Sequence, residues 1–195
     1  DVTVAGEANH AGSTAMADRK DALVAAAGFI NKVPEIVKEY GNEFTVATVG
    51  TIKVTPHSVN VIPGTCTFSL EIRDQSAEVM KLIENHLRQL LEDICKKYGV
   101  TSTFVPTSYH DPAPMSELVR GTIEEAVKEL GIDYTVIPSG AFHDSLIMTS
   151  VFPTGMIFVP SKDGISHSRY EYTAPEDIEN GCNVLLNTVL KLDEK

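Results

Sequence analysis

Four short stretches of this 195-residue chain gather polar and small side chains of types that catalytic sites use. The first surrounds His10, which follows an alternating apolar run and precedes a helical pattern, in a loop rich in small residues. Loops between regular elements often carry functional groups, so His10 is a candidate catalytic residue. The alternative is that His10 has a structural role, as a cap or in packing.

The second stretch pairs an amide with a cation. Asn60 lies in the turn sequence NVIPG, and Arg73 ends the alternating run that follows. The planar guanidinium of Arg binds a carboxylate through two parallel hydrogen bonds, so Arg73 could hold an acidic substrate. The alternatives are a turn role for Asn60 and a surface ion pair of Arg73 with Asp74 or Glu71.

The third stretch, residues 139–144, reads SGAFHD and follows a predicted strand. In an α/β sheet this is the carboxyl end of a strand, where ligands bind. His143 and Asp144 could share a metal ion, although consecutive side chains seldom point at one ion. Capping of the next helix by Asp144 is the alternative.

The fourth stretch, residues 160–171, holds His167 between two serines, with Glu171 four residues later. This pattern suits a metal-binding imidazole whose neighbours hydrogen-bond to it. A catalytic zinc ion needs about three protein ligands, and a two-metal site needs more. The chain contains no HxD, HExxH, paired-carboxylate or GxSxG motif, so it offers one good ligand and no complete active site.

Composition excludes several classes of partner. The net charge of −11 opposes binding to nucleic acid or to anionic membranes, and no apolar run is long enough to span a bilayer. Three widely spaced cysteines fit reduced thiols in a cytoplasmic protein. The chain begins at Asp1 with no Met and no basic, apolar leader, and we expect it to be a piece of a longer protein.

Periodicity predicts two domains, residues 1–110 and 111–195, joined at a Pro-containing junction. The first reads as strand, helix, strand, strand, helix, strand. The predicted elements span residues 1–7, 18–40, 44–54, 65–73, 76–98 and 100–109. Asp18 is the expected N-cap of the first helix, Pro34 predicts a kink or a break in it, and Gly41 predicts its end. This order is typical of a ferredoxin-like fold with two helices on one face of a four-stranded sheet.

The second domain alternates helices with short strands, which favours an α/β fold with parallel strands. We expect helices over 115–131, 141–150 and 175–192, and strands over 134–138 and 154–159. Two strands make a thin core, so this part resembles half of a sheet domain.

Taken in order, the motifs resemble those of a metal-dependent amidohydrolase family of the hydantoinase/carbamoylase type, within the zinc aminopeptidase clan. The motifs are GEANHAGSTAM with the following RKDAL, then NVIPG, EIRD, SGAFHD and GMIFVPSKDGISHSRYE, and together they cover essentially the whole chain. Members include N-carbamoyl-L-amino-acid hydrolases and allantoate amidohydrolases.

The resemblance implies a ferredoxin-like lid that also forms a homodimer, followed by the C-terminal part of a catalytic α/β domain. It implies hydrolysis of a non-peptide C–N bond in a small, carboxylate-bearing ureido substrate. Two divalent ions (zinc, manganese or cobalt) would be bound by the full-length parent. This chain alone would lack most of the ligands and the general base, so it would bind metal weakly or not at all and be inactive.

Residue by residue, the resemblance gives His167 the role of a metal ligand and His10 that of a lid histidine that reaches the partner subunit's site and steadies the oxyanion. Asn60 and Arg73 resemble the pair that binds the substrate carboxylate. Gly140 and Ala141 resemble the turn that lines the substrate pocket.

The chain departs from the family pattern at Ala15, Phe142 and Ser145, where Pro, Gly and Ala are typical, so the identity of the substrate stays open. Two other functions also stay open. One is an inactive dimerisation module, and the other is a fragment of a related dinuclear-metal peptidase.

Overall fold

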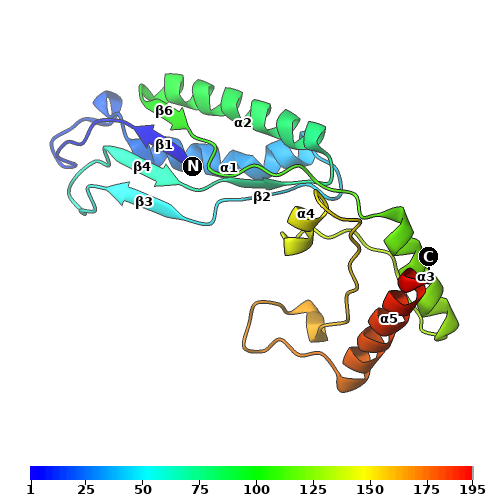
Figure 1. The fold of residues 1–195 in the computed structure, drawn as a ribbon. Helices are drawn as coiled ribbons and strands as arrows, with labels where there is room; N and C mark the ends of the chain where they lie inside the picture. Colours follow the sequence, from blue (N-terminus) through cyan, green and yellow to red (C-terminus); the bar gives the residue numbers. More distant parts are fainter. Residues whose placement is uncertain (195) are drawn as a thin grey trace. The chain divides into compact units, whose positions relative to one another are not determined.

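The computed structural model describes residues 1–194 and shows a mixed α/β chain with small antiparallel sheets (Figure 1). The chain divides into two compact units, Asp1–Pro112 (unit 1) and Ala113–Lys195 (unit 2). Within the described residues no helix combines the length and the apolar content needed to cross a membrane.

Unit 1 is built on a four-stranded sheet with the order β3-β4-β1-β6, in which all neighbours are antiparallel. The strands are β1 (Val2–Ala5), β3 (Ile52–Thr55), β4 (Thr65–Phe68) and β6 (Thr101–Phe104). Val2 and Val4 are fully buried, whereas Thr3 between them lies on the other face and shares a hydroxyl hydrogen bond of 3.1 Å with Thr67. This alternation is typical of an antiparallel sheet with one covered face.

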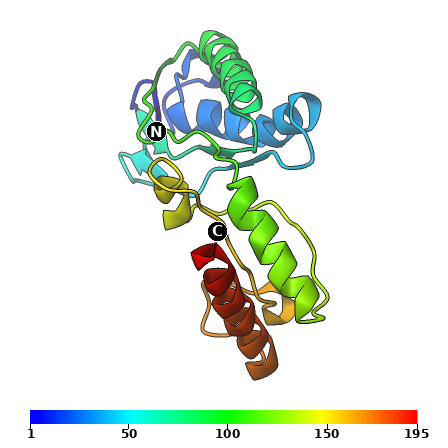
Figure 2. The same ribbon diagram turned by 45° about the vertical axis from the view of Figure 1, so that its right-hand side comes forward.

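Two long helices, α1 (Ala22–Tyr40) and α2 (Ala77–Tyr98), cover the apolar face of the sheet (Figure 2). The rings of Phe29 from α1 and Phe68 from β4 meet at 5.6 Å in the centre of this core. The expected break at Pro34 is wrong, because α1 continues through this residue. Pro34 is exposed, so water can reach the backbone group that loses its partner there.

The N-terminus of α1 differs from the prediction. Asp21, not Asp18, is the N-cap, and its Oδ1 accepts hydrogen bonds from the amides of Leu23 (2.9 Å) and Val24 (3.1 Å). Asp18 ends a short 3-10 turn, η1 (Met16–Asp18). The helix therefore begins three residues later than its apolar pattern indicates.

Both long strands predicted between residues 44 and 73 are interrupted. β2 (Val46–Thr48) pairs with β5 (Glu71–Arg73) in a separate two-stranded sheet, and β3 pairs with β4. Residues 49–51 lie opposite residues 69–70, so one segment carries one extra residue. Such an insertion is a β-bulge, which breaks the ladder and bends the strand.

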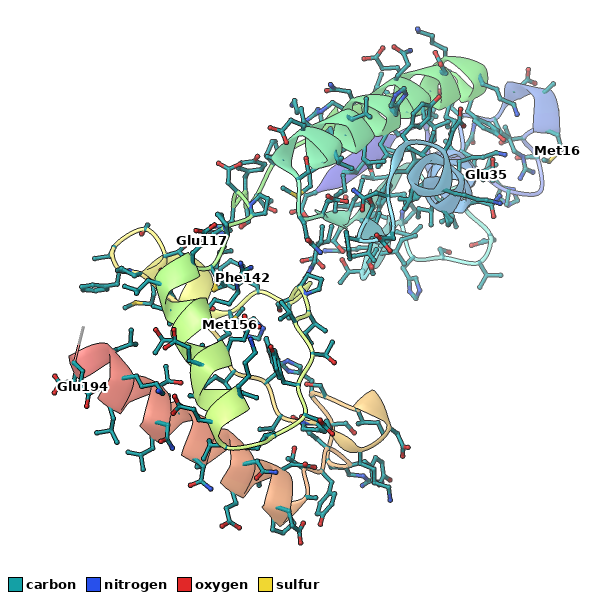
Figure 3. All side chains as sticks on the ribbon, turned by 90° about the vertical axis from the view of Figure 1, so that its right-hand side faces the viewer. Met16, Glu35, Glu117, Phe142, Met156 and Glu194 are labelled. Atoms are coloured by element: carbon teal, nitrogen blue, oxygen red, sulfur yellow. The ribbon has the colours of Figure 1, made fainter. Side chains whose placement is uncertain are left out.

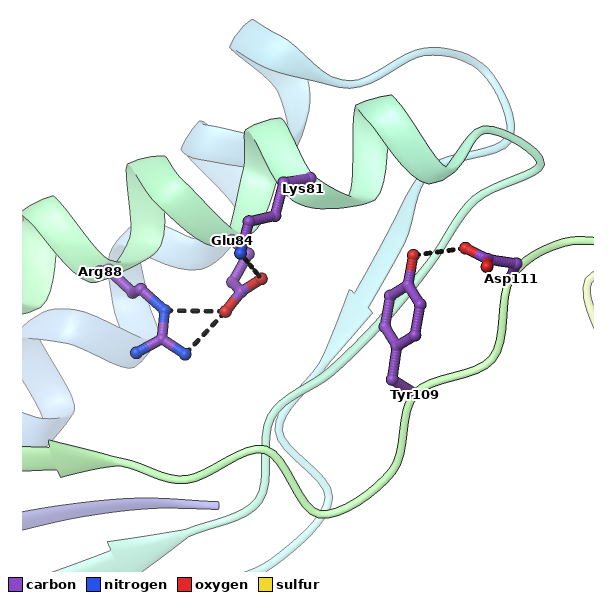
Figure 4. Close-up of polar contacts among 5 residues, drawn as sticks. All are labelled: Lys81, Glu84, Arg88, Tyr109 and Asp111. Carbon is purple, nitrogen blue, oxygen red and sulfur yellow. Dashed lines mark hydrogen bonds and ion pairs between the residues drawn. The ribbon is translucent and has the colours of Figure 1, made fainter.

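An ion-pair cluster on α2 leads to a contact with β6. Glu84 lies between Lys81 (2.9 Å) and Arg88 (2.7 Å), as Figure 4 shows. The Arg88 guanidinium lies 4.0 Å from the centroid of the Phe104 ring of β6. Burial raises the pKa of Glu84, but hydrogen bonds and charge from both cations outweigh it and hold the pKa below its usual value. This contribution to stability is present above the pKa of the unfolded state and is lost as the pH falls through the lower folded-state pKa.

The last strand of unit 1 is shorter than predicted, because β6 ends at Phe104 and residues 105–109 form no strand. The hydroxyl of Tyr109 donates to Asp111 at 2.6 Å (Figure 4), and this bond raises the pKa of Tyr109.

Unit 2 consists of helices α3 (Glu117–Glu129), α4 (Asp144–Met148) and α5 (Pro175–Asp193), with a short 3-10 turn, η2 (Lys162–Gly164). The predicted strands over 134–138 and 154–159, and the parallel sheet with them, are wrong for the described residues. A strand needs a neighbour to pair with, and neither segment has one.

Segment 154–159 packs on helices instead. A Cβ on Gly155 would lie 2.7 Å from Val119 of α3, and one on Gly181 of α5 would lie 2.6 Å from Val159. The buried side chains of unit 2 are few, and most of them are small: Thr122, Ala126, Val127, Val184 and Thr188.

The corrected N-cap can be tested by a matched pair of variants. Asp21→Ala should lower the free energy of unfolding of unit 1 by about 1 kcal/mol, because two helix amides lose their acceptor. Asp18→Ala should change it by less than about 0.5 kcal/mol, as an exposed substitution does. Urea titration of the chain, followed by circular dichroism, measures both. Equal losses would contradict the assignment of the cap.

Candidate active site

The loop that carries His10 is held by backbone packing at the end of β1. The amide of Gly6 donates to the Gly64 carbonyl (2.8 Å), and the amide of Glu7 donates to the Lys20 carbonyl (2.9 Å). A Cβ on Gly6 would lie 1.9 Å from the Lys20 carbonyl oxygen. Only glycine allows this approach, so Gly6 lets three segments of chain meet at this end of the sheet.

The same frame brings His10 and Asn60 together. The amide of Ala11 donates to the Asn60 carbonyl (2.9 Å), and His10 forms an isolated antiparallel bridge with Val61. The side-chain Oδ1 of Asn60 accepts from the Ser58 hydroxyl (2.8 Å). Two residues that are 50 positions apart therefore lie on adjacent backbone segments, and both are exposed.

The His10 loop also has internal contacts. The amide of Gly12 donates to His10 Nδ1 (3.0 Å), and the Thr14 hydroxyl donates to the His10 carbonyl (2.8 Å). Arg19 donates from Nη2 to the Ala11 carbonyl (2.6 Å) and from Nε and Nη2 to the Thr14 carbonyl (both 3.1 Å). Arg19 belongs to the RKDAL motif and has no predicted role of its own. Nothing in the sequence pattern points from Arg19 to backbone carbonyls.

Arg73 lies elsewhere on unit 1. It ends β5, opposite Val46, whereas Asn60 precedes β4 at the other end of the same interrupted hairpin. Arg73 is eight positions after Thr65, a span of about 26 Å in extended chain. Arg73 forms a half-exposed ion pair with Glu71 (2.8 Å). Asn60 and Arg73 therefore lie toward opposite ends of the hairpin.

In unit 2 the Gly140–Ala141 turn is closed by its neighbours. The Ser139 hydroxyl oxygen accepts from the Ala141 amide (3.3 Å) and lies 3.0 Å from His143 Nε2. His143, not Asp144, is the N-cap residue of α4. Phe142, the departure from the family pattern, is half exposed (Figure 3).

His167 lies in the loop between η2 and α5. It has φ of 55°, in the left-handed region, and its amide donates to Glu171 (2.9 Å). Its side chain is exposed, so the imidazole is accessible to an ion. Residues 1–194 contain no group of three or more side chains able to hold a metal together. The described chain thus supplies His167 as a single candidate ligand, which does not make a metal site.

The chain is similar to known proteins over almost its whole length. A sequence model of peptidase family M20/M25/M40 matches residues 2–191. The chain belongs to this family. It is 40% identical to the N-carbamoyl-L-amino acid amidohydrolase of Geobacillus stearothermophilus over 97% of its length, and 35% identical to the allantoate amidohydrolase of Bacillus subtilis over 98%. These similarities confirm the family resemblance inferred from the motifs.

A solved structure gives the same result. An amidase of the hydantoinase/carbamoylase family from Burkholderia vietnamiensis superimposes with a TM-score of 0.91 and 34% identity over 97% of this chain. The chain covers 46% of that structure and 46% of each of the two amidohydrolases. Amidohydrolases of family M20 generally depend on two metal ions, and their remaining length provides room for the ligands that this chain lacks.

The backbone frame around His10 can be tested with two glycine variants in unit 1. Gly6→Ala should destabilise unit 1 by several kcal/mol, because its Cβ would overlap the Lys20 carbonyl. Gly28→Ala, inside α1 with its nearest neighbour at 4.0 Å, should be neutral or stabilise by up to about 1 kcal/mol. Thermal unfolding of the two variants measures the change in Tm. An unchanged Tm in Gly6→Ala would contradict the close contact between Gly6 and the Lys20 carbonyl.

Proposed function

We propose that this chain is part of a metal-dependent amidohydrolase that cleaves a non-peptide C–N bond in N-carbamoyl amino acids, allantoate or similar ureido compounds. One observation carries the proposal. His10 and Asn60 are joined through adjacent backbone segments at one sheet end, in a chain 40% identical to an N-carbamoyl-L-amino acid amidohydrolase.

In this function His10 donates a hydrogen bond to the oxyanion that develops on the substrate carbonyl. Asn60 and Arg73 bind the substrate carboxylate, and Gly140 and Ala141 line the pocket. His167 is one metal ligand, and the others lie outside this chain. Two divalent ions would polarise the scissile carbonyl and lower the pKa of a water molecule.

Unit 1 is, on this proposal, the ferredoxin-like lid. Strand order β3-β4-β1-β6 with two helices on one face supports it, because a βαββαβ chain forms its sheet in that order. Unit 2 is the C-terminal part of the catalytic domain. It carries most of the exposed large apolar side chains, and those along α5 form a set: Ile178, Leu185, Leu186, Val189 and Leu190. Such a surface is typical of one that another part of a protein covers.

The lid also forms a homodimer, which the separation of Arg73 from Asn60 supports. A site that contains both residues must take them from two chains, because one chain holds them at opposite ends of a hairpin. We propose that each site takes His10 and Asn60 from one subunit and Arg73 from the other.

Hydrolysis assays test the function. The full-length protein with Mn²⁺, Zn²⁺ or Co²⁺ should release ammonia or carbamate-derived products from N-carbamoyl amino acids or allantoate. The 195-residue chain should show no turnover, since it supplies one candidate metal ligand. Dipeptides are the matched control substrates. Cleavage of dipeptides alone would favour a peptidase, and a dimer without any hydrolysis in the full-length protein would favour an interaction module.

Mixed dimers test the shared site. Full-length His10→Ala and Arg73→Ala proteins should each lose most activity. When the two are unfolded together and refolded, a random mixture should recover about a quarter of wild-type activity, because half of the dimers then hold one intact site. A mixture of His10→Ala with Asn60→Ala is the control and should recover nothing, since both residues come from the same subunit. No recovery in the first mixture would refute the two-chain arrangement.

A further inference from the structure

The ring of His10 is held in one orientation by its own loop. The Gly12 amide donates to Nδ1 at 3.0 Å, so Nδ1 must carry a lone pair. A neutral imidazole has a single N–H, which is then on Nε2. The nitrogen that can donate is therefore the one on the side of the ring away from the Gly12 amide.

Gly12 lies too close to the ring for a side chain. A Cβ at this position would lie 3.1 Å from His10 Cε1 and 3.4 Å from Nδ1. Any larger residue would press on the imidazole and lengthen the bond to Nδ1. The contact thus depends on where the backbone of residues 11–14 is held.

Arg19 holds that backbone. Its guanidinium, half buried, donates to the carbonyls of Ala11 and Thr14, which lie on either side of Gly12. No carboxylate of the described residues forms an ion pair with Arg19, so these carbonyls are its main acceptors. Bonds from a charged donor are short and strong, and three of them in a planar fork restrict the loop in position and in angle.

We propose that Arg19 is a positioning residue which, through the Gly12 amide, presents His10 as the Nε2–H tautomer. Its catalytic meaning rests on the proposed function, in which His10 donates to a developing oxyanion. A histidine that must donate needs its proton on the outward nitrogen before substrate arrives, because a donor already in place costs no reorganisation during the reaction. The loop sets that proton position in advance.

Nuclear magnetic resonance of the 15N-labelled chain tests the tautomer without any enzyme assay. At pH 8, long-range 1H–15N spectra should show His10 with a protonated Nε2 and an unprotonated Nδ1, assigned by the loss of those signals in His10→Gln. An exchange-averaged pattern, as an unrestrained imidazole gives, would overturn the inference. A protonated Nδ1 would overturn it as well.

Arg19 variants test the positioning role. Arg19→Met, which keeps the stem but has no donors, should move the His10 pattern toward the averaged one, and Arg19→Lys should lie between the two. Lys20→Met, whose side chain pairs only with exposed Glu7, is the control and should leave the pattern unchanged. If Arg19→Met fails to fold, the Lys variant decides. An unchanged His10 pattern in the variants that fold would overturn the role.

Kinetics of the full-length protein separate this inference from the proposed function. Arg19→Met should lower kcat by about tenfold to a hundredfold with little change in KM, the loss expected for a misplaced catalytic group. An equal loss in Lys20→Met would mean general destabilisation and count against Arg19. Full activity in His10→Ala would refute the catalytic role of His10, while the tautomer measured on the chain would stand.

Discussion

At the end of β1 the backbone of Gly6 lies so close to the Lys20 carbonyl that no side chain fits between them, and the candidate site depends on this approach. It brings the segment after β1 between two others, one leading into α1 and one leading into β4. Hydrogen bonds to Lys20 and to Gly64 then leave the His10 loop little freedom. Site residues on loops gain their accuracy from such backbone contacts with rigid elements.

A second constraint acts at the other end of the same hairpin. The extra residue in 49–51 changes which positions face the core, since Ala47 and Val49 pack inward before it and Val54 packs inward after it. A bulge also bends the strand, so Arg73 leaves the four-stranded sheet and belongs to a separate short ladder. The hairpin thus holds Asn60 near one end of unit 1 and Arg73 near the other.

How far the sequence could predict these features differs between elements. The helix α2 was predictable because its apolar side is long, Ser76 caps its start and Gly99 ends it with positive φ. The bulge was not predicted, because the apolar positions shift from Ala47 and Val49 to Val54 inside one run rich in Val and Thr, and only the pairing fixes where the extra residue lies. The cap of α1 was misassigned because Asp18 and Asp21 both fit the local rule, and tertiary hydrogen bonds around residue 22 decide between them. His10, Asn60 and His167 could be recognised as candidate site residues from their side-chain types and from the loops in which they lie. Arg19 could not be recognised, because hydrogen bonds to backbone carbonyls leave no pattern in a sequence.

Unit 2 shows why a correct hydrophobic pattern can still predict the wrong element. Residues 134–138 and 154–159 have the composition of strands, yet a strand is defined by its neighbour, and the described chain offers them none. Val136, Ile137 and Phe158 are accordingly exposed, as is the outer side of α5. His167 has the same character, since it is an accessible imidazole without a second ligand nearby. On the proposed function, the missing strand partners, the uncovered apolar side chains and His167 as a single metal ligand have one common explanation. All three would be met by one further body of chain, and the relatives of this chain carry about as much sequence again beyond the part that it matches.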